Sequence, residues 1–98
     1  MIQETLAWES AHQALQSMSV TRYTRGTVLL EKGDAQSALA EFSESRALAD
    51  RLGDAQGVAY ADLRSCEAHI KLGATALGRV ACDSARTAFA AAGVKDLV

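Results

Sequence analysis

Apolar residues recur three or four positions apart along most of the chain, which is the spacing of one helical face. The pattern holds over residues 35–52, 55–72 and 75–92. None of these segments alternates apolar and polar residues with a period of two, so strands are not expected. The pattern therefore predicts three consecutive amphipathic helices.

Glycine and aspartate separate the predicted helices. The pairs Gly33-Asp34 and Gly53-Asp54 each follow a leucine-containing segment with a basic residue in its last turn. A glycine in this place fits a left-handed helix end, and the aspartate that follows fits the N-cap of the next helix. Thr75 is expected to cap the last helix. Such short connections make successive helices antiparallel neighbours.

The segment before the first of these turns admits two interpretations. Its second part, from about Leu15 to Lys32, matches the third helix at an offset of 40 residues, which leaves Ile2 to about Gln13 as a separate helix. Serine and threonine residues make this stretch a weak helix former. A break is therefore expected between Gln13 and Thr21. The alternative is one bent or continuous helix, because no glycine separates the two parts.

Turn glycines and small residues also repeat at the offset of 40 residues, as Gly33 with Gly73 and Gly53 with Gly93. A repeat of this length indicates stacked helical hairpins, because one hairpin cannot bury its apolar face alone. The predicted fold is all-α, an antiparallel array of helix hairpins with four to five helices. It forms one domain over residues 1–98, with a capping helix at about 1–14, a first hairpin at 15–53 and a second at 54–93.

Composition and charge narrow the function classes. Hydrophobic residues make up 49% of the chain and aromatic residues only 5%, and there is no proline. Abundant alanine favours helices that approach closely. The net charge of -2 gives no reason to expect nucleic-acid binding. No apolar run nears the roughly 20 residues that span a bilayer, and the N-terminus lacks signal-peptide character. We expect a cytoplasmic protein that binds neither nucleic acid nor membrane.

The hairpin residues resemble those of tetratricopeptide repeats. That family places a small residue in the middle of the first helix, a glycine at the turn, and an alanine, an aromatic and a small residue along the second helix. The first hairpin supplies Gly26, Gly33, Ala38, Phe42 and Ser45 at these positions, and the second supplies Cys66, Gly73, Gly78, Cys82 and Ala85. Residues 47–54 are similar to the roughly 40-residue variant of bacterial signalling and transcription regulators. The resemblance covers Leu15 to Gly93.

The resemblance implies a protein-interaction module without catalytic residues or cofactor, which binds a partner's helix or extended peptide in a groove. The implied groove residues lie on the first helix of each hairpin: Val20, Tyr23, Thr27, Leu30 and Glu31, then Tyr60, Leu63, Glu67, Ile70 and Lys71. The alternative is that the larger ones only pack against neighbouring helices. The chain has no asparagine, so the family's carboxylate clamp is not expected.

Three other functions stay open. Cys66 and Cys82 are expected to be small core residues, since two cysteines do not make a disulfide framework. With His69 and Asp62 they could instead bind a metal ion, or Cys66 and His69 could form a nucleophile pair. A homodimer through the first helix, which carries Trp8, is the remaining alternative.

Overall fold

The computed structural model describes residues 2–91 and Gly93, with side chains from Ala7 onward. This part contains four helices and no strand: α1 (Ile2–Glu31), α2 (Ala35–Leu52), α3 (Ala55–Lys71) and α4 (Thr75–Ala91). The all-α prediction is confirmed. The last three helices begin and end within one residue of their predicted bounds, because their limits are set by local turn residues.

The turn between α2 and α3 shows how one residue ends a helix and the next begins another. Gly53 is left-handed, with φ of 70°, and the N–H of Asp54 donates to the carbonyl of Ala49 at 2.9 Å, as in a Schellman turn. The Asp54 carboxylate then accepts the N–H of Gly57 at 3.0 Å. Asp34 caps α2 in the same way. Both predicted aspartate caps are confirmed.

The turn before α4 differs from the prediction. Left-handed glycines recur every 20 residues, with φ between 70° and 89°, at Gly33, Gly53, Gly73 and Gly93. The residue after the third of these, Ala74, takes the place that the aspartates occupy in the other turns. Thr75 is already the first helical residue, so the predicted cap at Thr75 is wrong.

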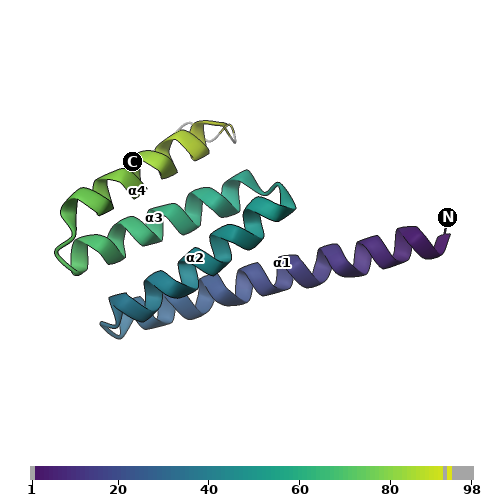
Figure 1. Ribbon diagram of the computed structural model, residues 1–98, viewed down its shortest axis with the longest axis horizontal. Helices are drawn as coiled ribbons and strands as arrows, with labels where there is room; N and C mark the ends of the chain where they lie inside the picture. Colours follow the sequence, from purple (N-terminus) through teal and green to yellow (C-terminus); the bar gives the residue numbers. More distant parts are fainter. Residues whose placement is uncertain (1, 92, 94–98) are drawn as a thin grey trace.

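The first helix is continuous. α1 runs from Ile2 to Glu31 without interruption, so the predicted break between Gln13 and Thr21, and with it the separate capping helix, is wrong. Serine and threonine cost only some tenths of a kcal/mol each relative to alanine, and packing outweighs this. Ser19, in the predicted break, is buried against α2. In Figure 1 the first half of α1 extends beyond the end of α2.

The helices form two hairpins that stack side by side. α1 packs along α2, α3 packs along α4, and α2 packs on α3 between them (Figure 1). There are two apolar clusters: one around Phe42, which also includes Ala68 of α3, and one around Phe89 between α3 and α4. Both phenylalanines are fully buried. Within residues 2–91, no helix is both long and apolar enough to cross a membrane.

The two hairpins are held at equivalent positions by different contacts. In the first, Gly26 faces the ring of Phe42 so closely that a Cβ there would lie 2.6 Å from the ring's Cε1. In the second, the residues 40 positions later, Cys66 and Cys82, form a disulfide between α3 and α4, with their Cα atoms 5.2 Å apart. The prediction of two unlinked core cysteines is wrong here, because small residues at one level of a close helix crossing lie within bonding range.

A buried carboxylate links three helices. Asp62 in the middle of α3 is buried. It accepts a 2.7 Å hydrogen bond from Nε of Arg46 on α2 and another of 2.7 Å from the hydroxyl of Ser84 on α4. A buried carboxylate is stable only with such partners. Asp62 therefore fixes α3 between the helices on its two sides.

Candidate partner-binding groove

α1 and α3 both pack on α2, and Tyr23 of α1 reaches over to contact α3. The ring of Tyr23 is edge-on to Tyr60 of α3, with centroids 6.4 Å apart and planes at 77°. Its hydroxyl accepts a 3.0 Å hydrogen bond from Nε of Arg64. Tyr60 in turn stands edge-on to Phe89 of α4, at 5.0 Å. These contacts make a continuous aromatic row from α1 to α4, with centroid spacings in the favourable range.

Arg64 is the charged residue that contacts this aromatic row, through its hydrogen bond to Tyr23. The hydrogen bond with Tyr23 is the main cause that raises the pKa of the Arg64 guanidinium above its ordinary value, and Glu67 raises it further. Glu67 accepts from Nη1 of Arg64 through both oxygens, at 3.1 and 3.2 Å. Partial burial of the guanidinium acts in the opposite direction. Arg64 and Glu67 therefore neutralise each other and leave little net charge on this part of the groove.

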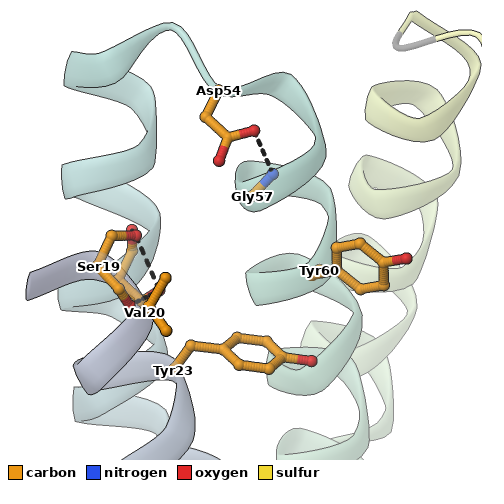
Figure 2. A pocket seen from close by; sticks show the side chains of 7 residues that line it. Ser19, Val20, Tyr23, Asp54, Gly57 and Tyr60 are labelled. Atoms are coloured by element: carbon orange, nitrogen blue, oxygen red, sulfur yellow. Dashed lines mark hydrogen bonds between the residues drawn. The ribbon is translucent and has the colours of Figure 1, made fainter. Parts of the chain in front are cut away.

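A pocket opens beside the aromatic row, where α1 and α3 diverge. Its volume is about 270 Å³, and it is lined by Ser19, Val20, Tyr23, Ser45, Asp54, Gly57 and Tyr60. Figure 2 shows Tyr23 reaching from α1 toward α3, with Val20 on one side of the space and Tyr60 on the other. Drug-sized ligands need about 300–1,000 Å³, so this pocket is sized for a single side chain.

The pocket floor is held in place by a pair of serines. Ser45 donates its hydroxyl to the carbonyl of Ser19 at 2.9 Å, and Ser19 donates to the carbonyl of Ser45 at 3.1 Å. This reciprocal pair brings the backbones of α1 and α2 close together. Gly57 adds no side chain on the opposite wall. The hollow exists because three of its lining residues, Ser19, Ser45 and Gly57, are small.

Of the groove residues implied by the sequence, six line the pocket or are exposed to solvent, and the other four are engaged in contacts within the fold. Val20, Tyr23 and Tyr60 line the pocket, and the side chains of Val20 and Tyr60 are 60% and 48% exposed. Ile70, Glu31 and Lys71 are exposed further along the same helices.

The other implied residues have partners inside the fold. Leu30 is buried in the cluster around Phe42, and Leu63 packs on the cluster around Phe89. The Thr27 hydroxyl donates to the carbonyl of Tyr23 at 3.0 Å. Glu67 belongs to the ion pair with Arg64.

Several pocket and groove residues were not predicted as such: Ser19, Ser45, Asp54, Gly57 and Arg64. The sequence does carry a signal for one of them, because a glycine inside the first turn of a helix leaves room for a neighbouring group. Ser19 and Ser45 carry no such signal in the sequence, because their pairing depends on how α1 crosses α2.

The cysteine cluster is not assembled for metal binding. The two sulfur atoms are bonded to each other, and a metal ligand or nucleophile must be a thiolate. Among the described residues no group of three His, Cys, Asp or Glu side chains could hold a metal ion.

The fold and groove define the class of the molecule. It is an all-α domain of two stacked helical hairpins, compatible with a helical-repeat fold. No family model, curated protein or solved structure matches the chain.

Proposed function

We propose that the chain is a tetratricopeptide-like interaction module that binds a helix or extended peptide of another protein in the groove between α1 and α3. The observation that carries the proposal is the pocket at the junction of these helices, with exposed Val20 and Tyr60 at its edges. Tyrosine is among the residue types enriched at the centre of protein interfaces. The repeat length noted above supports the further proposal that the chain is part of a bacterial regulatory or signalling protein.

The resemblance to tetratricopeptide repeats is supported at the helix crossings. Gly26, Ala38 and Ser45 are all buried between α1 and α2, where the family needs small residues. Gly78 and Ala85 are buried between α3 and α4 in the same way. Close crossing of this kind lets short hairpins stack, and a stack leaves its first helices free to line a surface.

A matched pair of substitutions tests the groove. Short linear peptides from a displayed random library are selected on the immobilised chain, and their affinities are measured by fluorescence polarisation. Val20→Glu, at the pocket edge, should weaken binding by about tenfold or more, because it places a solvated charge in a desolvated contact. Val80→Glu, on α4 at 67% exposure, makes the same chemical change away from the groove and should leave binding unchanged. Equal effects of both variants, or no selected peptide, would refute the proposal.

One observation supports self-association as a second function. The first half of α1 projects beyond α2 (Figure 1), and Trp8 on it is 63% exposed and stacks on His12 of the same helix. Isolated helical segments are marginally stable in water, so pairing with the same segment of a second copy would stabilise it. Light scattering should then give a mass that rises with concentration, and Trp8→Glu should abolish the rise. A constant monomer mass would dismiss this function.

A further inference from the structure

We infer that the pocket between α1 and α3 binds a basic side chain, lysine or arginine, of the partner peptide; this rests on the proposed function and specifies its ligand. The pocket has one charged lining residue, the carboxylate of Asp54, and its other walls are aromatic, aliphatic or small. A long apolar stem that ends in a cation matches this combination, because such side chains bury the stem and keep the charge at the rim.

The two carboxylate oxygens of Asp54 are in different situations. Oδ1 accepts the N–H of Gly57 at 3.0 Å and caps α3, the single side-chain hydrogen bond of Asp54 within the described residues. Oδ2 lies over Gly57, where a Cβ on that glycine would be only 2.6 Å away. Figure 2 shows this second oxygen pointing toward the space between Val20 and Tyr60. An incoming cation therefore finds an acceptor without displacing the cap.

The charge of Asp54 is only partly offset by its own helix. The N-terminus of α3 carries the equivalent of about half a positive charge, so a negative remainder faces the pocket. Arg64 and Glu67, the ion pair beside Tyr23, compensate each other. Asp54 is the one charged residue that the pocket lining itself contributes.

The tyrosines favour the same ligand. Tyr23 and Tyr60 line the same pocket as Asp54, and a cation within about 6 Å of a tyrosine ring is attracted by the ring's quadrupole. Phenol rings also pack well against methylene groups. A neutral aliphatic side chain would use the rings alone, and an acidic one would be repelled by the carboxylate.

The chain offers a matched control for a test on this carboxylate. Asp34 caps α2 with the same geometry, accepting the N–H of Ser37 at 3.1 Å, and it does not line the pocket. Asparagine is as good an N-cap as aspartate. Asp54→Asn and Asp34→Asn therefore remove the same charge from the same structural role, inside and outside the site.

The experiment uses the peptides selected from the displayed library on the intact chain. We expect them to share a lysine or arginine. Replacing that residue by norleucine, which keeps the stem and removes the charge, should weaken binding by about tenfold, as a charge-assisted hydrogen bond does. Asp54→Asn should weaken the basic peptide by the same factor and leave the norleucine peptide unchanged, while Asp34→Asn should affect neither.

The outcomes separate the two proposals. Selected peptides that lack a basic residue, or that bind Asp54→Asn and the unaltered chain equally, overturn the basic-side-chain inference. If Val20→Glu still weakens their binding while Val80→Glu does not, the groove proposal survives that result. An equal loss of affinity with Asp34→Asn would show that overall charge and not the pocket selects the ligand, which also overturns the inference.

Discussion

Gly26 lies near the C-terminal end of α1, where it faces the ring of Phe42 on α2, and Gly26→Ala tests that contact directly. In an exposed helix this change stabilises by about 1 kcal/mol, because glycine is the poorer helix former. Here the new Cβ would lie 2.6, 2.8 and 3.0 Å from three atoms of the Phe42 ring. Phe42 is fully buried, so its ring can move only if its neighbours move as well. Overpacking a core costs about 1–3 kcal/mol, and subtracting the propensity gain leaves an expected net loss of up to about 2 kcal/mol.

The loss is measurable as a lower urea midpoint, followed by far-ultraviolet circular dichroism. For a domain of this size it corresponds to a fall in Tm of about 4–8 °C per kcal/mol. The same change is then made in a Phe42→Leu background, where the ring atoms that oppose the Cβ are gone. There Gly26→Ala should be neutral or stabilising, and the difference between the two backgrounds gives the coupling energy. If Gly26→Ala stabilises the unaltered chain, Gly26 does not pack against Phe42 as closely as the structure has it, and the reasoning is refuted.

Three further substitutions test the remaining contacts in urea unfolding. Arg46→Met should cost about 1–2 kcal/mol, because buried Asp62 loses a charged partner, although Arg46 is itself half exposed; no change would mean that water replaces the guanidinium. Cys82→Ser should cost up to about 3 kcal/mol through loss of the disulfide with Cys66, which joins two residues 16 positions apart in the sequence. A reductant should lower the stability of the unaltered chain to the same level and leave Cys82→Ser unchanged. Asp34→Ala should cost about 1 kcal/mol by removing the N-cap of α2, and an unchanged midpoint would contradict that role.

Local signals were enough to predict most of the fold. Gly53 and Asp54 specify where α2 ends and α3 begins, because the left-handed conformation and the N-cap hydrogen bond depend only on residues a few positions away. The continuity of α1 was not predictable in this way. Ser19 favours a break by its own propensity, yet its hydrogen bonds to Ser45, 26 residues later, keep it helical.

The candidate site was predicted less completely than the fold. The resemblance placed Tyr23 and Tyr60 on one surface, where the structure puts their rings in an edge-to-face contact. The local turn residues assigned Asp54 only to a cap, since the pocket that it lines is formed by residues of α1, α2 and α3 that are far apart in the sequence. The disulfide was missed for a related reason. The sequence placed Cys66 and Cys82 on neighbouring helices, but whether their sulfur atoms meet depends on the register of that hairpin.

The even spacing of the left-handed glycines has a consequence for how this chain tolerates changes of length. From α2 onward, one helix with its turn occupies 20 residues, and two consecutive helices with their turns occupy 40. A single residue inserted within a helix would rotate everything beyond it by about 100° and separate pairs such as Gly26 and Phe42. Insertion or removal of a complete hairpin would leave every remaining crossing aligned. Duplication of whole units is therefore the route by which such a chain can lengthen and still fold.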